Sequence, residues 1–254
     1  VHVLTEALKH SFADRAAYLG DTDFSKVPIR RLLSQTNAQE LADRINLKQT
    51  QPLKSYGRFL PVDDSGTSHF SVMDSAGNAV ACTETVNTSF GSWMVDPKYG
   101  VVLNNEMDDF AARPGEPNAF GLIQSEANCV EPGKKPLSSM TPTIIVENGK
   151  AIHALGGSGG PRIISNTLQV LVNLTRFKMP VDQAVRQPRF HHQWVPDKLY
   201  MQPALFKIRS QALQDRGHTV ATRKSVAVVQ AVSRTNNGLT GFSDPRKHGK
   251  AAGY

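Results

Sequence analysis

The chain carries SGTSHFSVMD at residues 65–74, where a small flexible residue precedes a hydroxyl side chain that opens an apolar strand. Alternation along an extended segment puts the side chains of Thr67 and His69 on one face and those of Phe70 and Val72 on the other. We therefore expect a strand with one polar face and one face that packs against the core.

Thr67 is a candidate nucleophile, provided that a base lies beside its hydroxyl. A threonine hydroxyl is a weak nucleophile without an adjacent base, but a threonine at a chain terminus has a base in its own α-amino group, which titrates near neutrality. This chemistry requires cleavage of the Gly66–Thr67 bond, with the Thr67 hydroxyl attacking the Gly66 carbonyl to give an ester that water opens. Gly66 lacks a Cβ and tolerates the strained backbone that such an attack needs. A Gly-Thr pair is also typical of an ordinary loop-to-strand junction. Other motifs in the chain must therefore decide whether Thr67 is a nucleophile.

The length of 254 residues and the 39% hydrophobic content indicate a globular protein with one sizeable domain or two small ones. No apolar run approaches the ~20 residues that cross a bilayer. The first residues, VHVLTE, lack both an initiator Met and the basic-then-apolar layout of a signal peptide. We expect no membrane span in this segment and a sequence that begins in mid-protein.

The net charge of +7 is concentrated near the C-terminus, because residues 186–254 hold 12 Lys or Arg and only 3 Asp or Glu. Nucleic-acid binding is one interpretation of such an excess. The basic residues are scattered, few aromatic residues interleave them, and no nucleic-acid motif accompanies them. A solvated or partner-facing surface fits these features better, so we expect no nucleic-acid partner.

The segment before Thr67 is predicted to be helical and then irregular. Leu4, Leu8 and Phe12 recur at four-residue spacing and predict an amphipathic helix over residues 1–19. A second helix is expected to be capped by Thr36. Residues 49–66 contain two prolines and two glycines without periodicity, which predicts an exposed connector.

From Thr67 onward the pattern changes to hairpins, then helices, then strands. Turn chemistry predicts hairpins over residues 67–87 and 143–155, the second with an Asn-Gly turn. Helices are expected after Pro161, around residues 181–186 and over 204–216, and strands over 218–223 and 225–232. This order predicts an α/β fold of sheets covered by helix layers.

A glycine cluster, GGSGG at residues 156–160, lies at the predicted strand-to-helix junction. Backbone N–H groups at a helix N-terminus bind phosphate or stabilise an oxyanion. The Walker and dinucleotide patterns are both missing, which argues against phosphate. An oxyanion site and a plain tight turn remain open on this feature alone.

Two polar clusters have several possible roles. NNEMDD at residues 104–109 is typical of a solvated turn, of a weak divalent-ion site or of a site for an ammonium group. Ser138 and Ser139 offer two hydroxyls that can hold a carboxylate, although paired serines are also common in loops. His191 and His192 are interpreted as structural, since adjacent strand residues point apart and no third metal ligand lies at useful spacing.

One further polar stretch lies near the C-terminus. Asp244-Pro245-Arg246 is interpreted as a turn with a surface ion pair.

Taken together, these stretches resemble the gamma-glutamyltransferase family of N-terminal-nucleophile enzymes, which are made as one precursor that cuts itself into a large and a small subunit. The resemblance covers essentially the whole chain. It is carried by residues 67–72, 87–91, 103–110, 136–142, 156–162, 188–194 and 252–254. It implies stacked antiparallel β-sheets between helix layers (αββα). Residues 1–66 would be the C-terminal part of the large subunit with a connector, and residues 67–254 the small, catalytic subunit.

The resemblance also implies roles for individual residues. Thr67 would be both the self-cleaving residue and the nucleophile, and Thr85 the hydroxyl that supports it. The other implied roles are substrate binding by Asn87, Glu106 and Asp109, carboxylate binding by Ser138 and Ser139, and an oxyanion hole at Gly159 and Gly160. A zwitterionic γ-glutamyl head needs anions for its ammonium and donors for its carboxylate, so the implied roles agree with the physical chemistry.

The implied activity is two-step transfer of a γ-glutamyl group from glutathione or a related compound to an amino acid, a peptide or water. The implied mature form is a heterodimer made from a zymogen, in the periplasm or at the cell surface. No metal or organic cofactor is implied. The implied partners are the substrates, the acceptors and the remainder of the large subunit.

Two features limit the transfer of roles. Residues 1–66 resemble only the end of the large subunit, so the arginine that grips the substrate carboxylate in relatives lies outside this sequence. Phe120 occupies a segment that resembles the lid loop, where some relatives have tyrosine, which leaves the preference for transfer or hydrolysis open.

Two other functions are kept as alternatives. A glutaryl-cephalosporin acylase of the same superfamily shares the nucleophile but needs no α-amino group, so Glu106, Asp109 and the lid argue against it. The alternative from another class is a non-enzymatic binding module whose basic C-terminal third docks on an acidic partner.

Overall fold

The computed structural model describes residues 1–56, 67–118, 120–224 and 226–253. The chain divides into two compact units. Unit 1 comprises Val1–Asp64, Asn105–Ser138 and Phe190–Lys224, and unit 2 comprises Ser65–Asn104, Ser139–Arg189 and Ser225–Tyr254. These units are defined by packing. The predicted domain boundary between residues 66 and 67 is an expected site of peptide cleavage, which packing does not test, so that boundary stays a prediction.

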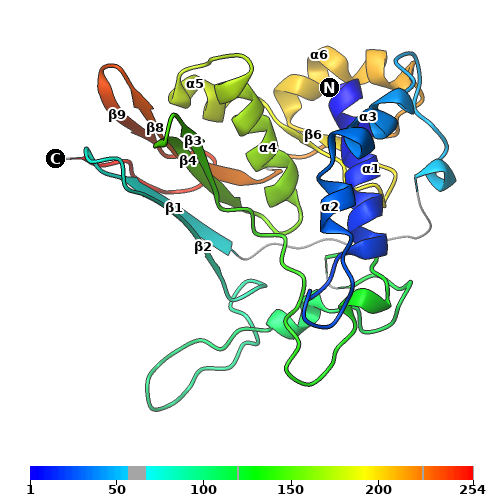
Figure 1. The fold of residues 1–254 in the computed structure, drawn as a ribbon, viewed down its shortest axis with the longest axis horizontal. Coiled ribbons are helices and arrows are strands. Elements are labelled where there is room, and N and C mark those ends of the chain that lie inside the picture. Colours follow the sequence, from blue (N-terminus) through cyan, green and yellow to red (C-terminus); the bar gives the residue numbers. More distant parts are fainter. Residues whose placement is uncertain (57–66, 119, 225, 254) are drawn as a thin grey trace. The chain divides into compact units, whose positions relative to one another are not determined.

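Unit 2 is built from two antiparallel sheets (Figure 1). The smaller is the hairpin of β1 (Thr67–Met73) and β2 (Ala79–Thr85). The larger has the order β3-β4-β8-β9, with β3 (Thr143–Glu147), β4 (Lys150–Ser158), β8 (Val228–Thr235) and β9 (Gly238–Phe242). Strand β1 packs on β4 and β8, so the two sheets are stacked.

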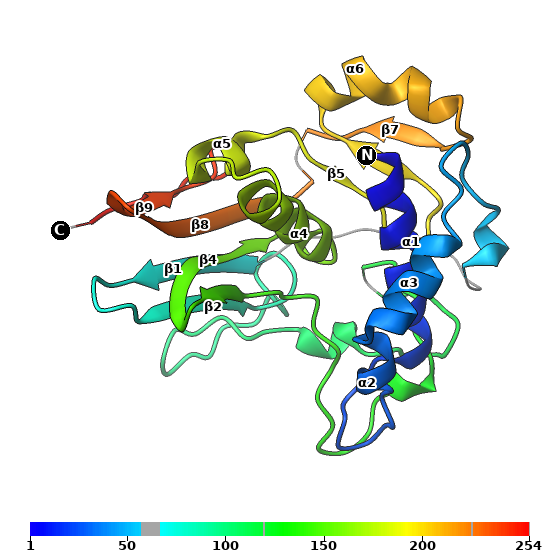
Figure 2. The ribbon, with the colours of Figure 1, turned by 45° about the horizontal axis from the view of Figure 1, so that its top comes forward.

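Helices α4 (Arg162–Thr175) and α5 (Val181–Arg186) pack on the larger sheet. Figure 2 shows α4 alongside β4 and β8, on the side of the larger sheet away from β1. Leu155 and Val229 of the sheet and Val170 and Leu174 of α4 are buried in one core cluster. Stacked antiparallel sheets with a helix layer confirm the predicted fold class.

The turns of both predicted hairpins form for the chemical reasons expected. The Asp74 carboxylate accepts hydrogen bonds from the backbone N–H groups of Gly77 (2.8 Å) and Asn78 (2.9 Å), which closes the first turn. Asn148 and Gly149 have φ values of 50° and 76° in the second turn. A two-residue turn with two positive φ angles matches the right-handed twist of its strands.

The prediction about the two faces of β1 was wrong. The face of His69 packs against the larger sheet, while Phe70 and Val72 are 51% and 54% exposed. A Cβ on Gly156 of β4 would lie 2.3 Å from His69 Cε1, so the glycine makes room for the imidazole. Both ring nitrogens of His69 are hydrogen-bonded, and this satisfies a polar group between the sheets.

Unit 1 contains the remaining helices of the described residues and a small sheet. Its helices are α1 (His2–Tyr18), α2 (Ile29–Leu32), α3 (Gln35–Asp43), α6 (Pro203–Gln214) and the 3-10 turns η1 (Leu53–Ser55), η2 (Glu106–Asp109) and η3 (Glu126–Asn128). Its sheet has the order β5 (Phe190–His191), β6 (Leu199–Met201), β7 (Val220–Thr222), with β5 and β6 antiparallel and β6 and β7 parallel.

Three details of the predicted helices and connector differ from the structure. The cap of α3 is Ser34, whose hydroxyl accepts from Asn37 N at 3.0 Å, because Ser34 stands three residues before that N–H group and Thr36 does not. Helix α1 is not simply amphipathic, since the polar Glu6 and Lys9 are as buried as Leu8. In the predicted connector, η1 forms at residues 53–55, and residues 57–66 lie outside the described residues.

The predicted surface pair at Asp244 was wrong, because Asp244 is fully buried. Its carboxylate lies 2.5 Å from Arg189 Nη2, whose guanidinium is also buried, and 3.0 Å from the donating N–H of Val229. Arg246 Nη1 contacts the same carboxylate at 2.9 Å. The turn is therefore an anchor that holds the C-terminal segment to the core of unit 2.

The histidine pair behaves as predicted. His192 Nδ1 accepts from Trp194 N at 3.1 Å, and its Nε2 lies 3.2 Å from an Asp197 carboxylate oxygen. His191 Nε2 donates to Gln193 Oε1 at 2.8 Å. Among the helices of the described residues, none is both long and apolar enough to cross a bilayer.

Candidate active site

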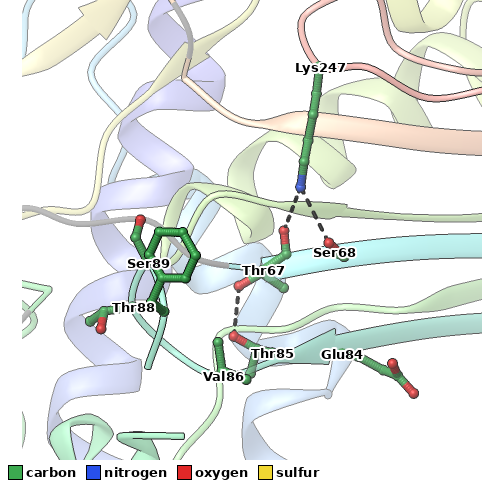
Figure 3. A pocket seen from close by; sticks show the side chains of 9 residues that line it. Thr67, Ser68, Glu84, Thr85, Val86, Thr88, Ser89 and Lys247 are labelled. Carbon is green, nitrogen blue, oxygen red and sulfur yellow. Dashed lines mark hydrogen bonds between the residues drawn. The ribbon is translucent and has the colours of Figure 1, made fainter. Parts of the chain in front are cut away.

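Thr67 opens β1 and faces Thr85 at the end of β2. The hairpin register pairs these two residues, and their hydroxyl oxygens lie 3.1 Å apart (Figure 3). Thr85 Oγ1 also accepts a 2.8 Å hydrogen bond from the backbone N–H of Asn87. Because this N–H already points at the Thr85 oxygen, the Thr85 hydroxyl proton is directed elsewhere, and Thr67 Oγ1 is within its reach.

Asn87 has a left-handed backbone with φ of 74° and is buried. Asparagine adopts this conformation more readily than most residues with a Cβ. The strained turn that it makes directly after β2 aims its N–H back at Thr85. Asn87 therefore contributes at least its backbone to the surroundings of Thr67.

Thr67 lines a cavity of about 430 Å³ in unit 2. The other lining residues are Ser68, Glu84, Thr85, Val86, Thr88, Ser89, Phe90 and Lys247. Lys247 Nζ donates to the Thr67 carbonyl oxygen at 3.0 Å and lies 3.4 Å from Ser68 Oγ (Figure 3). The cavity thus combines hydroxyl groups, an aromatic ring and one ammonium group around Thr67.

His69 lies on the same face of β1 as Thr67 and is enclosed between the two sheets. Its Nδ1 lies 2.7 Å from Thr83 Oγ1 and its Nε2 lies 2.9 Å from Ser71 Oγ. Burial lowers the pKa of His69 to about 4. The imidazole is therefore neutral near pH 7 and adds no charge to the surroundings of Thr67.

Gly159 and Gly160 connect β4 to α4 and have φ values of 139° and 57°. A side chain at either position would be strained, so the turn requires glycine. Both belong to the same unit as Thr67, and Gly156, three residues before Gly159, packs against His69, two residues after Thr67. The predicted oxyanion residues therefore directly follow β4, which is stacked on the strand of the predicted nucleophile, and this is compatible with the predicted role.

Glu106 and Asp109 form a carboxyl pair at the two ends of the 3-10 turn η2 in unit 1. Their side chains share a hydrogen bond, and burial raises the pKa of both. For Asp109, burial together with the nearby Glu106 charge raises the pKa to about 7, while the charge of Arg15 opposes the shift. Asp109 is buried and Glu106 is half-buried, so two carboxyl groups this close hold a proton between them near neutrality, and a bound cation would displace it.

Buried amides hold this turn in position. The carbonyl oxygen of Asp109 accepts from Asn128 Nδ2 at 2.8 Å and from Gln124 Nε2 at 3.2 Å. Asn128 Oδ1 in turn accepts from Leu137 N at 2.9 Å, and Arg15 Nη2 donates to Leu137 O at 3.3 Å. The acidic turn and the residue that precedes Ser138 are therefore fixed by one network within unit 1.

The serine pair and the predicted lid have different surroundings. Ser138 is exposed at the end of a unit 1 segment, and Ser139 is buried at the start of a unit 2 segment. Phe120 is buried within unit 1, where its backbone N–H donates to Asn118 Oδ1 at 3.0 Å and its carbonyl accepts from Gln193 Nε2 at 3.4 Å. The lid role of this loop stays a prediction.

The structure thus brings the predicted site residues into two groups. Unit 2 holds Thr67, Thr85, Asn87, Ser139, Gly159 and Gly160, and unit 1 holds Glu106, Asp109, Phe120 and Ser138. Gly66, the predicted residue before the cut, lies outside the described residues. Sequence reasoning missed Lys247, because a lysine in a basic tail has no local signal that distinguishes it from its neighbours.

A separate cluster of possible metal ligands lies in unit 1. His2, Glu6 and His218 each offer one ligand atom, all within 4.8 Å of one another. His2 Nε2 donates to Asn46 O at 2.8 Å, so its Nδ1 accepts from His218 Nε2, 2.6 Å away. The Glu6 carboxylate accepts from a threonine and a tyrosine hydroxyl. These hydrogen bonds occupy the lone pair of His2 Nδ1 and place a proton on His218 Nε2, the two imidazole nitrogens that face each other in the cluster.

Comparison with known protein families gives one match over the entire sequence. The model of the family described as gamma-glutamyltranspeptidase matches residues 1–254. The glutathione hydrolase proenzyme of Escherichia coli K12 is 42% identical over 249 residues, which is 97% of this chain and 43% of that protein. The proenzyme of Pseudomonas aeruginosa is 41% identical over 98% of this chain and 45% of its own length. The chain thus spans less than half the length of these relatives.

Solved structures agree with this match. A gamma-glutamyltranspeptidase from Pseudomonas nitroreducens in complex with L-DON is 40% identical with a TM-score of 0.70, and the match covers 73% of this chain and 98% of that one. A cephalosporin acylase from Bacillus halodurans has a TM-score of 0.82 over 99% of this chain and 44% of its own, at 24% identity. At that identity the acylase shows a shared fold alone.

Proposed function

Since the chain belongs to the gamma-glutamyltranspeptidase family, we propose that it is part of a self-cleaving enzyme that transfers γ-glutamyl groups. The precursor cuts itself between Gly66 and Thr67. Thr67 then takes the γ-glutamyl group of glutathione or a similar compound and passes it to an amino acid, a peptide or water. The relatives named as proenzymes of glutathione hydrolase support this activity.

The observation that carries the proposal is the 3.1 Å contact between the hydroxyl oxygens of Thr67 and Thr85 at the cavity wall. A hydroxyl nucleophile needs a partner that orients it and a base that takes its proton. Thr85 is the partner, and the α-amine released by the cut is the base.

The reaction proceeds in two half-reactions. In the first, the Thr67 α-amine accepts the hydroxyl proton while Oγ1 attacks the γ-carbonyl carbon. The C–N bond breaks, the departing amine takes the proton, and a γ-glutamyl ester remains on Oγ1. In the second, the amine of an acceptor or a water molecule loses a proton to the α-amine and attacks the ester carbonyl, and Oγ1 leaves and regains its proton.

Substrate recognition is divided among the remaining residues. Glu106 and Asp109 bind the α-ammonium, Asn87 also binds the amino-acid end of the substrate, and Ser138 and Ser139 donate to the α-carboxylate. The N–H groups of Gly159 and Gly160 stabilise the oxyanion that forms at the γ-carbonyl. The raised pKa of Asp109 supports its role in ammonium binding. The like charge of Glu106 contributes to this raised pKa, and a bound cation would offset the repulsion between the two carboxylates.

The proposed complete enzyme contains the rest of a large subunit. Phe70, Val72 and Val80 form an apolar surface on the outer face of β1 and β2, each at least 50% exposed, and a helix layer from that subunit would cover it. The Pseudomonas nitroreducens structure matches over 98% of its own chain but over only 73% of this one. This supports a mature form in which residues 67–254 are a separate chain. We expect residues 1–254 expressed alone to be inactive or poorly folded.

The proposed location is the periplasm or the cell exterior. The alternative activity is that of a glutaryl-cephalosporin acylase, which has no use for an ammonium-binding pair. The carboxyl pair of half-buried Glu106 and buried Asp109 favours the γ-glutamyl substrate. Turnover of a glutaryl-anilide equal to or faster than that of a γ-glutamyl-anilide would reverse this choice.

Intact-mass measurement of the full-length protein tests the central step. The precursor should yield a product that begins Thr-Ser-His-Phe, and Thr67→Ala should abolish both the cut and the turnover of γ-glutamyl-anilide. Thr67→Ser is the matched control, because it keeps a hydroxyl nucleophile and an α-amine. An unsplit protein with full activity would disprove the proposal.

A further inference from the structure

Lys247 is the feature of the cavity that the proposed reaction has not used. Its ammonium nitrogen lies 3.0 Å from the carbonyl oxygen of Thr67 and 3.4 Å from Ser68 Oγ. Figure 3 shows the side chain extended from the C-terminal segment toward the start of β1. The contact joins residues 180 positions apart in the sequence, so it exists only in the folded unit.

The C-terminal segment is anchored immediately before Lys247. Asp244 is buried against Arg189, and Arg246 Nη1 donates to Val185 O at 3.0 Å and to Asp244 Oδ1 at 2.9 Å. These contacts fix the backbone from which the Lys247 side chain extends. An exposed lysine normally samples many rotamers, and an anchored backbone limits the region that its ammonium group occupies.

The contact with the Thr67 carbonyl oxygen also limits the distance between the Lys247 ammonium and the Thr67 backbone nitrogen. The carbonyl oxygen and the backbone nitrogen of one residue are about 3 to 4 Å apart. The Lys247 nitrogen is therefore within about 7 Å of the Thr67 nitrogen, which becomes an α-amine after the proposed cut. A positive charge at this range disfavours protonation of an amine, even when solvent weakens the interaction.

The other titratable groups around Thr67 do not cancel this charge. His69 on the same strand is neutral near pH 7 because burial lowers its pKa to about 4. Glu84 on β2 is the acidic member of the described cavity lining, and in Figure 3 its carboxylate points away from Thr67. The Lys247 ammonium is thus the nearest formal charge among the described residues that line the cavity.

We propose that Lys247 is a positioning residue that holds the Thr67 carbonyl and keeps the released α-amine in its neutral, proton-accepting form. The inference rests on the proposed function, since it assumes the cut before Thr67. Its consequence is that the enzyme retains activity at lower pH than it would without the lysine. Lys247 itself contacts neither the proton nor the acyl group.

The test compares pH profiles of kcat/KM for γ-glutamyl-anilide in the full-length, matured enzyme. Lys247→Met should move the acidic limb up by about half a pH unit, so that its kcat/KM is about threefold below wild type at pH 6 and equal to wild type near pH 9. Lys247→Arg keeps the charge and should restore the wild-type limb. Lys250→Met, on the same tail, is the matched control for net charge and should leave the limb unchanged.

Salt dependence gives a second readout that a purely structural role would not alter. At 1 M salt the acidic limb of the wild-type enzyme should move toward that of Lys247→Met, while the limb of the variant itself should stay in place. Identical limbs for wild type and Lys247→Met in the matured protein would overturn the inference. So would a uniform loss at all pH values, which would indicate a tether without an electrostatic role. If the wild-type protein neither splits nor turns over the anilide, the proposed function fails instead.

Discussion

Thr67 and Thr85 are cross-strand partners at the first rung of the β1–β2 hairpin, and their hydroxyl oxygens are 3.1 Å apart. The turn at residues 75–78 sets the register of the hairpin, and the register sets this contact. A slip of one residue would turn Thr85 to the other face of its strand. The geometry of the proposed nucleophile is therefore decided by a turn six rungs away.

Replacement of Thr85 should affect chemistry more than folding. Thr85→Val keeps the shape but removes the oxygen that contacts Thr67 Oγ1 and accepts from Asn87 N. We expect kcat for γ-glutamyl-anilide to fall by about 10-fold to 100-fold with little change in Tm. Thr85→Ser, which keeps the hydroxyl, should recover most of the loss. A fully active valine variant would remove Thr85 from the mechanism.

The pKa of Asp109, raised to about 7, predicts a pH-dependent preference between two substrates. Below pH 7 the carboxyl pair holds a proton and binds an ammonium group less well. The ratio of kcat/KM for γ-glutamyl-anilide to that for glutaryl-anilide should therefore fall as the pH drops from 8 to 6. The ratio cancels the titration of the Thr67 amine, which both substrates share.

Glu106→Gln supplies the control for this experiment. Removal of the like charge lowers the pKa of Asp109, so the fall in the substrate ratio should move to lower pH. The ratio itself should also be smaller at pH 8, because one anion is gone. A ratio that is independent of pH in the wild-type enzyme would show that Asp109 does not bind the ammonium group.

His69 predicts part of the pH dependence of stability. Its folded pKa of about 4 is below the ordinary value of 6.5, so between these values the unfolded chain binds a proton that the folded chain does not. Stability from this group is complete above pH 6.5 and is lost as the pH falls toward 4. The urea midpoint should therefore be lower at pH 5 than at pH 7.5, and His69→Asn should reduce the difference. An unchanged difference would show that other groups, such as His218, account for it.

The buried ion pair of Arg189 and Asp244 predicts a large loss of stability when Asp244 alone is replaced. Asp244→Asn leaves a buried guanidinium without its counter-charge and should lower the free energy of unfolding by about 3 to 5 kcal/mol. Chemical denaturation would measure it. Asp215→Asn, at an exposed aspartate, is the matched control and should change stability by less than about 0.5 kcal/mol. An equally small effect at Asp244 would contradict the anchoring role of this turn.

The sequence by itself determined the two hairpins, the main helices and the family. Turn residues such as Asp74 and the Asn148-Gly149 pair act through their own backbone, and the periodicity of α4 reports on its own buried face. Such interactions span a few residues, so a local pattern is enough to predict them. The motif that opens with Thr67 and the glycines at positions 159 and 160 is recognisable for the same reason.

Tertiary structure alone decided which face of β1 packs, where Asp244 lies and what Lys247 contacts. Each depends on a partner far away in sequence: Gly156 makes room for His69, Arg189 neutralises Asp244, and Thr67 receives the Lys247 ammonium. Alternation and composition describe a side chain without its partner, so they assigned His69 to the polar face of a strand whose other face was expected to pack, and Asp244 to the surface. Burial and charge pairing are properties of two segments brought together, and only the folded chain supplies the second segment.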